Sequence, residues 1–269
     1  MRYLKDLYKQ TLALVFTSVF CVSIGFSQKS SSKSYFDQTT LLRHVEALSS
    51  DAFEGRRTGT KGAVKAKKYI INQFHSLKVK PLKKSYEQTF VFSKGKKEYK
   101  GTNVIGFIKG KCEPNKVIVI SAHYDHEGIK RGKVYNGADD NASGVAMLLQ
   151  LAASLKKGPS NNNYLFIAFS GEEKGLFGSN YFAKNPTIDL ARVNYMINMD
   201  MVGRLNKENS LAVYGVGTSP VWKDVLNKEN TDGFDLVFEE SGVGPSDHTS
   251  FYLQDIPVLH FFTGQHEDY

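Results

Sequence analysis

Cysteine is scarce in this chain, which has two cysteines among its 269 residues. Cys21 lies in an N-terminal segment with the features of a secretory signal, so Cys112 alone would remain after processing. One cysteine cannot form an internal disulfide, which excludes a small fold held together by disulfides. The folded chain must therefore be stabilised by a hydrophobic core or by bound metal.

Long hydrophobic runs are also missing once the N-terminal segment is passed. A positively charged start precedes an apolar run at 12–26, and small residues stand at the expected cleavage position. The run is short for a membrane anchor. A lipid anchor on Cys21 is the less favoured alternative, because the bulky Phe20 precedes it. We predict a signal peptide at 1–27, a linker at 28–36, export to the periplasm or the exterior, and no stable membrane insertion after signal removal.

The chain also lacks the pattern of a nucleic-acid-binding protein. Its net charge is +8, and the predicted signal removes three positive charges and one negative charge, which leaves about +6. The remaining lysines are scattered, and neither an aromatic-interleaved basic stripe nor a helix-turn-helix signal accompanies them. We therefore expect a solvated basic surface and no nucleic-acid partner.

Strand and helix patterns alternate through the rest of the sequence. The β-branched run at 117–121 is typical of a strand buried on both faces, and the polar, glycine-punctuated segment at 50–60 indicates a loop. The periodicity predicts helices at 39–48, 61–77, 142–155, 175–183, 219–230 and 247–253, and strands at 86–92, 103–108, 117–121, 164–169, 193–199, 211–214, 234–238 and 258–262. This alternation predicts an α/β fold, a three-layer sandwich around a mostly parallel mixed sheet.

Polar side chains follow several of the predicted strands. His123 and Asp125 come after the strand at 117–121, and their spacing of two places both on one side of an extended chain. A carboxylate so placed can accept the second N–H of a metal-bound imidazole. In open α/β sheets, ligands bind beyond the carboxyl ends of the strands. Taken alone, the segment also fits an ordinary polar loop.

Acidic residues stand at three further places of this kind. Asp140 precedes a long helix, the pair Glu172 and Glu173 follows one strand, and Asp200 follows another. Neighbouring carboxylates at a strand end repel one another unless a cation lies between them. Helix caps and solvated glutamates explain each acid singly, but not their joint placement. His248, ahead of the last strand, would supply a second imidazole.

The charges of these residues match a pair of zinc ions. Asp140, Glu173 and Asp200 carry three negative charges, and a hydroxide would supply the fourth against two Zn²⁺. Imidazole and carboxylate are ligands that suit zinc. The sequence thus predicts two zinc ions in a core at 101–269, within a single domain at 37–269 to which 37–100 form the lead-in.

The segments HYDH, NGADDNASG, GEEKGLFGS, NMDMVGR and SDHTSF, in this order, resemble the secreted bacterial co-catalytic di-zinc aminopeptidases of the leucyl type. Glutaminyl cyclases and glutamate carboxypeptidase are more distant relatives. The resemblance covers roughly residue 103 to the end. It implies that His123 and Asp200 bind one zinc ion and that Glu173 and His248 bind the other. It further implies that Asp140 bridges the two ions.

The same resemblance implies roles for two acids that bind no metal. Asp125 would orient the first imidazole, and Glu172 would be the general base for water attack on a peptide carbonyl. The bond from Asp140 to Asn141 is expected to be cis. Peptides with a free N-terminus would be the substrates, whereas a carboxypeptidase would need a cationic clamp, for which Arg204 is the candidate.

Two alternatives to an aminopeptidase stay open on these residues. One is a glutaminyl-peptide cyclotransferase, although such enzymes are expected to run on one zinc ion and to lack part of this set. The other is a non-catalytic binding relative, which would be expected to have lost ligands. Family chains also usually continue past HEDY with a closing helix, so the sequence is interpreted as one that may lack it.

Overall fold

The computed structural model describes residues 36–111, 116–158 and 161–267. Residues 35–269 form one compact unit. The predicted signal peptide, nearly all of the predicted linker, and Cys112 lie outside the described residues. Of the helices in the described ranges, none is both long enough and apolar enough to cross a membrane.

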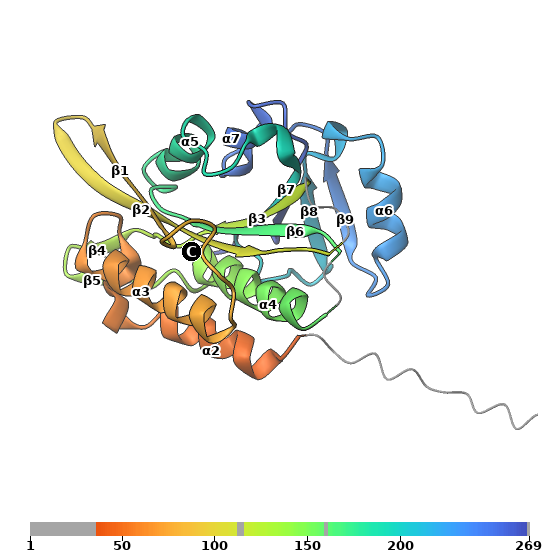
Figure 1. Ribbon diagram of the computed structural model, residues 1–269. Coiled ribbons are helices and arrows are strands. Elements are labelled where there is room, and N and C mark those ends of the chain that lie inside the picture. Colours follow the sequence, from red (N-terminus) through yellow and green to blue (C-terminus); the bar gives the residue numbers. More distant parts are fainter. Residues whose placement is uncertain (1–35, 112–115, 159–160, 268–269) are drawn as a thin grey trace, which may run out of the picture. The chain divides into compact units, whose positions relative to one another are not determined.

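A mixed sheet forms the centre of the described unit (Figure 1). Its eight strands follow the order β1-β2-β6-β3-β7-β10-β8-β9. The bounds are β1 Glu87–Lys94, β2 Lys97–Ile108, β3 Val117–His123, β6 Asn163–Phe169, β7 Val193–Met199, β8 Ser210–Tyr214, β9 Asp235–Glu239 and β10 Val258–Phe262. Strands β6, β3, β7 and β10 run parallel to their neighbours within this group, and β8 pairs parallel with β9. The remaining pairs are antiparallel.

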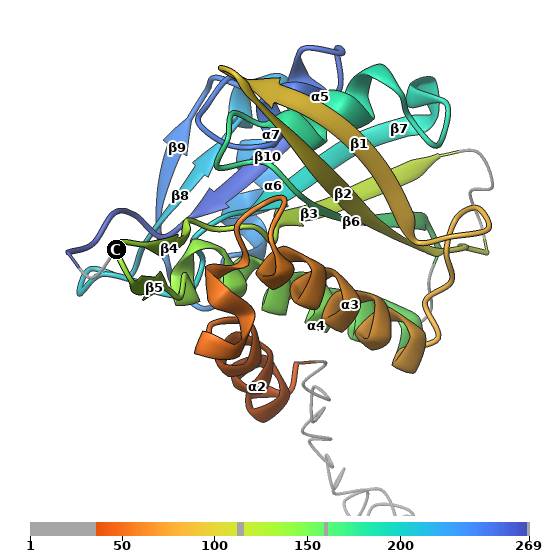
Figure 2. The ribbon, with the colours of Figure 1, turned by 90° about the vertical axis from the view of Figure 1, so that its left-hand side faces the viewer.

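Helices cover both faces of this sheet (Figures 1 and 2). Three of them lie on one face, namely α2 (Gln38–Leu48), α3 (Lys61–Ser76) and α4 (Gly144–Lys157). On the other face lie α5 (Phe177–Lys184) and α7 (His248–Tyr252), while α6 (Trp222–Glu229) accompanies the end formed by β8 and β9. Short 3-10 turns occur at Asp51–Arg56, Leu190–Arg192 and Val216–Thr218. The predicted three-layer α/β/α sandwich is confirmed.

Strand β3 shows why the sheet must be covered twice. All seven of its residues are buried. Ile118 and Ile120 join the apolar cluster under α3 and α4, whereas Val117 and Val119 join the cluster on the opposite face. Alternate side chains of a strand point to opposite faces, so an unbroken β-branched run buries apolar area in both layers.

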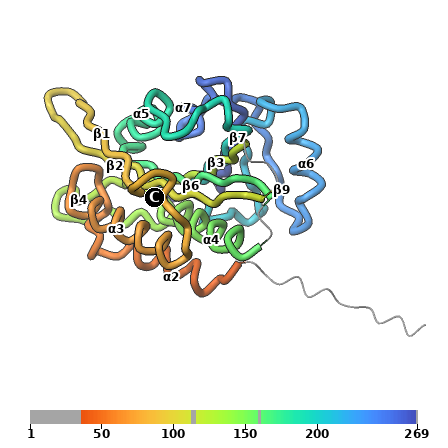
Figure 3. Tube along the Cα trace, viewed as in Figure 1, coloured from red at the N-terminus to blue at the C-terminus, as the bar shows by residue number. Residues whose placement is uncertain are grey.

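The periodicity of the sequence did not predict one small hairpin. It consists of β4 (Gly128–Lys130) and β5 (Lys133–Tyr135), which pair antiparallel apart from the main sheet. It lies beside the segment Asp51–Arg56, where we expected a plain loop and the structure has a 3-10 turn (Figure 3). At Gly55, a β-carbon would lie 2.4 Å from the carbonyl oxygen of Tyr135, so only glycine permits this close approach.

Helix α3 turns a different stripe inward from the one its spacing suggested. The helical spacing of the sequence places Val64, Lys68, Ile71 and Phe74 near one face of this helix. Phe74 is fully buried, but Val64 is 46% exposed and Ile70 is fully buried. The buried stripe of the helix consists of Gly62, Ala63, Ala66, Ile70 and Phe74, and Val64 lies outside it.

Two substitutions in α3 test this orientation. Ile70→Ala should lower the free energy of unfolding by about 2–5 kcal/mol, because it removes buried methyl groups and leaves a cavity. Val64→Ala should change it by less than about 0.5 kcal/mol, because the side chain is largely exposed. Urea unfolding of both variants, with a chelator present throughout, measures the difference. Equal losses would contradict the described face.

Candidate active site

The polar residues singled out in the sequence meet at one edge of the sheet. β3 ends at His123, while Glu172 follows the end of β6 and Asp200 follows the end of β7. These three strands are parallel neighbours, so their carboxyl ends lie at the same edge. The strand order alone therefore brings together residues up to 77 positions apart.

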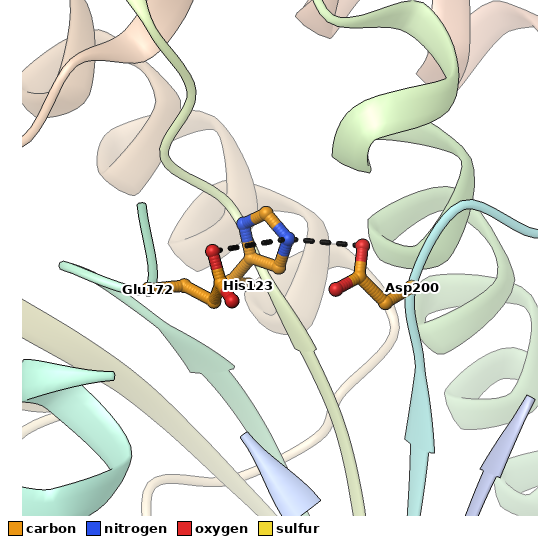
Figure 4. A group of neighbouring side chains, drawn as sticks. All are labelled: His123, Glu172 and Asp200. Carbon is orange, nitrogen blue, oxygen red and sulfur yellow. Dashed lines mark hydrogen bonds and ion pairs between the residues drawn. The ribbon is translucent and has the colours of Figure 1, made fainter. Parts of the chain in front are cut away.

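His123, Glu172 and Asp200 form the first of two candidate metal-binding groups, with donor atoms within 4.8 Å of one another (Figure 4). The Nε2 atom of His123 lies 3.0 Å from Oδ1 of Asp200 and 4.0 Å from Oε2 of Glu172. Ser246, in the segment SDHTSF, donates its hydroxyl to the other oxygen of Asp200 at 2.8 Å. The hydroxyl fixes that oxygen and leaves Oδ1 facing the imidazole.

The second group consists of His126, Asp140 and Glu173. The Nδ1 atom of His126 lies 2.7 Å from Oε1 of Glu173 and 3.4 Å from Oδ2 of Asp140. The other oxygen of Asp140, Oδ1, lies 3.2 Å from Nε2 of His123. Asp140 therefore faces both groups, with one carboxylate oxygen directed to each.

These separations suit zinc. Two ligand atoms about 2.1 Å from a tetrahedral zinc ion lie about 3.4 Å apart. The donor-to-donor distances about Asp140, 3.2 and 3.4 Å, are close to that value. The donors are imidazole nitrogens and carboxylate oxygens, which zinc accepts. The residues present thus fit zinc.

The orientation of His123 is set by backbone. Its Nδ1 lies 3.1 Å from the carbonyl oxygen of Asp125, whereas the carboxylate of Asp125 is 3.9 Å away. A carbonyl can only accept, so Nδ1 carries a proton and donates it, while Nε2 faces the acids. The Asp125 carboxylate instead accepts from Thr58 Oγ1 at 2.7 Å and from the Glu172 N–H at 3.3 Å. Asp125 thereby links His123 to Glu172.

Asp140 is held by the turn Ala138–Ser143, which precedes α4. The peptide bond to Asn141 is cis, as expected. The Asn141 amide donates to the carbonyl oxygen of Met199 at 3.0 Å, and its oxygen accepts from the N–H of Gly144 at 2.9 Å. These bonds join the turn to the end of β7. They therefore fix the position of Asp140 relative to Asp200, which follows Met199.

The Arg56 side chain forms hydrogen bonds to several of the loops around the site. It is buried, and its guanidinium donates to the carbonyl oxygens of five residues: Tyr124 at 3.0 Å, Leu48 at 2.5 Å, Asn136 at 2.6 Å, Gly137 at 2.8 Å and Asp140 at 3.5 Å. One acceptor lies between His123 and Asp125, and three lie on the approach to Asp140 or at it. The guanidinium of Arg56 therefore connects the loops that carry both donor groups.

Burial and mutual repulsion govern the protonation of the acids. Burial, reinforced by the negative charges of Asp247 and Asp200, raises the pKa of Glu172 to about 10 in the absence of metal. Burial alone would lower the pKa of His123, but the charges of Asp200 and Glu172 outweigh it and hold that pKa well above its ordinary value. The site thus gathers protons when no cation is bound, which is expected where negative charge is concentrated.

His248, the predicted second imidazole ligand, lies in neither group of described residues. It opens α7, and its ring stacks on that of His260 with centroids 4.4 Å apart. Burial, together with the charge of His260, lowers the pKa of His248 to about 2. Its assignment as a ligand stays a prediction.

Sequence reasoning missed three residues of this site. His126 stands in the segment HYDH, three positions after His123, but no spacing rule singled it out. Thr58 and Arg56 lie in a segment interpreted only as a loop. The run EGRRTG places Arg56 between two glycines, and this is a sequence signal that could have drawn attention. In the structure Glu54, Gly55 and Arg56 all have φ between 52° and 62°.

A cavity of about 600 Å³ adjoins the second group. Asp140 and His126 are among its lining residues. Its wall includes the apolar side chains Leu41, Leu42 and Val45 of α2 and Met147 of α4. The polar residues Asp139, Arg204 and His266 also line it. Space for a substrate therefore lies directly beside the candidate ligands.

Comparison with known proteins identifies the family. The sequence profile of peptidase family M28 matches residues 103–269, more than half of the chain. The chain belongs to peptidase family M28. It is 33% identical over 170 residues to Aminopeptidase YwaD of Bacillus subtilis strain 168, which covers 61% of this chain and 36% of YwaD. The chain thus spans about a third of the length of that curated relative.

Solved structures of other enzymes share the fold. BSAP, a zinc aminopeptidase from Bacillus subtilis, matches with a TM-score of 0.70 at 19% identity, over 85% of this chain and 86% of BSAP. The glutaminyl cyclase of Porphyromonas gingivalis matches with a TM-score of 0.69 at 18% identity, over 87% of this chain and 86% of that one. At such identities the likeness establishes the α/β sandwich and nothing finer.

The guanidinium of Arg56 can be tested by a substitution that keeps its charge. Arg56→Lys should destabilise the chain by about 2–4 kcal/mol, because an ammonium cannot reach carbonyls on several sides and leaves them buried without a donor. Thermal unfolding and zinc titration should both show the loss. Arg57→Lys, at the partly buried neighbouring position, is the control and should leave both nearly unchanged. Equal behaviour of the two variants would contradict the role given to Arg56.

Proposed function

We propose that this M28 chain is a zinc-dependent metallopeptidase that removes N-terminal residues from peptides. The observation that carries the proposal is Asp140, whose two oxygens face two separate donor groups at 3.2 and 3.4 Å. A carboxylate so placed suits a pair of metal ions. YwaD and BSAP, named as an aminopeptidase and a zinc aminopeptidase, support the choice of metal and reaction.

Four residues would hold the zinc pair. His123 and Asp200 face one position, Glu173 faces the other, and Asp140 reaches both. When bound, two zinc ions would supply a water of lowered pKa and an electrophile for the peptide carbonyl oxygen. The sequence also predicts His248 as a fifth metal ligand, although this residue lies outside both donor groups.

Glu172 is proposed as the general base. Its carboxylate lies beside the first group, 4.0 Å from Nε2 of His123, and its backbone N–H is bound by Asp125. The backbone anchor fixes where the side chain starts. The carboxylate would accept a proton from the attacking water at an Oε atom and return it to the leaving amine.

Bound zinc ions would offset the charges of Asp140, Glu173 and Asp200, so the choice of peptide terminus depends on the cations near the site. A carboxypeptidase would need a cation for the terminal carboxylate. Arg56 is occupied by backbone carbonyls, and Arg204 lies on the cavity wall rather than in either donor group. A free N-terminus is therefore the proposed recognition element.

Export belongs to the same proposal. The positively charged start and the apolar run at 12–26 support a signal peptide at 1–27, so the enzyme would act in the periplasm or outside the cell.

A panel of aminoacyl chromogenic substrates tests this function. The chain should release the chromophore, lose the activity when a chelator is added, and regain it with zinc. The same substrates with an acetylated amine should be inert, because the proposed recognition needs a free ammonium. Cleavage of acetylated substrates, or activity that survives chelation, would contradict the proposal.

The likeness to a glutaminyl cyclase provides the second candidate function. A peptide that begins with glutamine separates the two. An aminopeptidase releases glutamine from it, whereas a cyclase returns a peptide of the same length that has lost ammonia. Cyclised product without cleavage would replace the proposed function with the second one.

Neighbouring glutamates provide a matched test of the mechanism. Glu172→Gln should lower kcat by about 10²–10⁴-fold and keep the zinc content, because this residue is proposed to move a proton and not to bind metal. Glu173→Gln should instead reduce the zinc content. Kinetics and metal analysis of both variants check the assignment. Loss of zinc from Glu172→Gln would reverse the two roles.

A further inference from the structure

We propose that Asn103 is a positioning residue for Glu172, because its side chain holds both ends of the loop that carries this glutamate. The loop runs from Ser170, the residue after β6, to Gly178 in the first turn of α5. This inference rests on the proposed function, since it assigns a further residue to the same reaction.

The register of the sheet places Asn103 beside the start of this loop. Val104 of β2 pairs with Ala168 of β6 in an antiparallel arrangement, so Asn103 lies next to the carboxyl end of β6. On its other side, Asn103 lies opposite Gln88 of β1. The residue is 0% exposed. A fully buried amide is unfavourable unless hydrogen bonds satisfy its donors and its acceptor.

The Asn103 amide forms hydrogen bonds to both ends of the loop. Its oxygen accepts from the N–H of Ser170 at 3.2 Å, and its Nδ2 donates to the carbonyl oxygen of Gly178 at 2.9 Å. The same nitrogen also donates to Oε1 of Gln88 at 3.0 Å. One end of the loop offers a donor and the other an acceptor, so a single orientation of the amide satisfies both. One side chain thus sets the distance between the two ends.

Gly178 allows the two ends of the loop to meet across this amide. A β-carbon at Gly178 would lie 2.5 Å from Oδ1 of Asn103 and 2.2 Å from the carbonyl oxygen of Ser170. Both separations are shorter than van der Waals contact, so any side chain would push the ends apart. Glycine is the residue that permits so close an approach of backbone segments.

Hydrogen bonds inside the loop carry this constraint to Glu172. Its carbonyl oxygen accepts from the N–H of Gly175 at 2.7 Å, and the carbonyl oxygen of Gly171 accepts from the N–H of Phe177 at 3.0 Å. The N–H of Glu172 donates to Asp125. A loop that is bonded internally and held at both ends fixes the point from which the glutamate side chain extends. Displacement of a reacting group by about 1 Å can cost about 100-fold in rate.

The chain provides a matched asparagine at the opposite end of the same strand. Asn163 begins β6 and is 1% exposed. Its amide donates to the carbonyl oxygen of Lys116 at 2.8 Å and accepts from the N–H of Gly110 at 3.1 Å. It therefore joins two segments by the same pair of bonds, but at the end of β6 that lies away from the site. Asn163→Ala controls for the loss of a buried amide.

The test compares Asn103→Ala with this control in the full chain at saturating zinc. Asn103→Ala should lower kcat on an aminoacyl chromogenic substrate by about 10–100-fold, with KM and zinc content near those of the wild type. Amide hydrogen exchange of residues 171–177 should become faster, because the loop opens locally more often. Asn163→Ala should lose a similar amount of thermal stability and keep the wild-type kcat and loop exchange.

A double-mutant cycle separates positioning of Glu172 from a general structural role. Glu172→Gln removes the group that is proposed to transfer the proton. If Asn103 acts through Glu172, adding Asn103→Ala to Glu172→Gln should cause no further loss of kcat. Losses that multiply would mean that Asn103 acts on something else, and they would overturn the inference while the proposed function stands.

Gln88→Met provides a milder variant in case Asn103→Ala does not fold. It removes one partner of the amide at a partly exposed position, so kcat should fall by a smaller factor and residues 171–177 should exchange faster. Wild-type kcat in folded Asn103→Ala, or wild-type kcat and exchange in Gln88→Met when Asn103→Ala is unfolded, would overturn the inference. A wild-type chain that cleaves none of the aminoacyl substrates contradicts the proposed function itself, and this inference fails with it.

Discussion

Repulsion among carboxylates is the constraint around which this molecule is arranged. Asp125, Asp140, Glu172, Glu173 and Asp200 all lie at the carboxyl edge of the sheet, in surroundings that are buried or nearly so. Burial of so much like charge is unfavourable unless cations or hydrogen bonds offset it. The imidazoles and donor groups around these acids offset part of it. The remaining need is what a pair of divalent ions would meet.

Arg56 is the permanent part of that compensation. Burial lowers the pKa of its guanidinium to about 10, while the charges of Asp140, Asp125 and Glu173 oppose the shift, so it remains charged at neutral pH. Its N–H groups donate to backbone carbonyl oxygens rather than to the carboxylates. The acids therefore stay available to bind metal, while the loops that carry them are held in one place.

The sequence predicted the parts of the structure that repeat. Buried strands are recognised in the sequence as unbroken apolar runs, and the first polar residues mark their ends. His123, Glu172 and Asp200 were predicted as site residues on this basis. The hairpin at 128–135 was missed because its short polar strands owe their shape to contact with Asp51–Arg56 and bury little of their own. Local periodicity carries no record of such contacts.

The same limit applies within the site. His126 and Arg56 matter because distant segments converge on them, and neither lies at a strand end. The carboxylate of Asp125 was expected to meet His123, but the carbonyl of the same residue does so, and the carboxylate turns to Thr58. Sequence spacing places a residue near a partner, whereas the choice of atom is settled by packing.

The order of the strands also bears on how the chain folds. The first donor group joins β3 to the end of β7, a separation of 77 residues in sequence, and this group does not form until β6 and β7 have docked on either side of β3. Contacts of such long range are entropically costly and form late. A nascent or partly folded chain therefore offers zinc no assembled site, which confines tight metal capture to the finished fold.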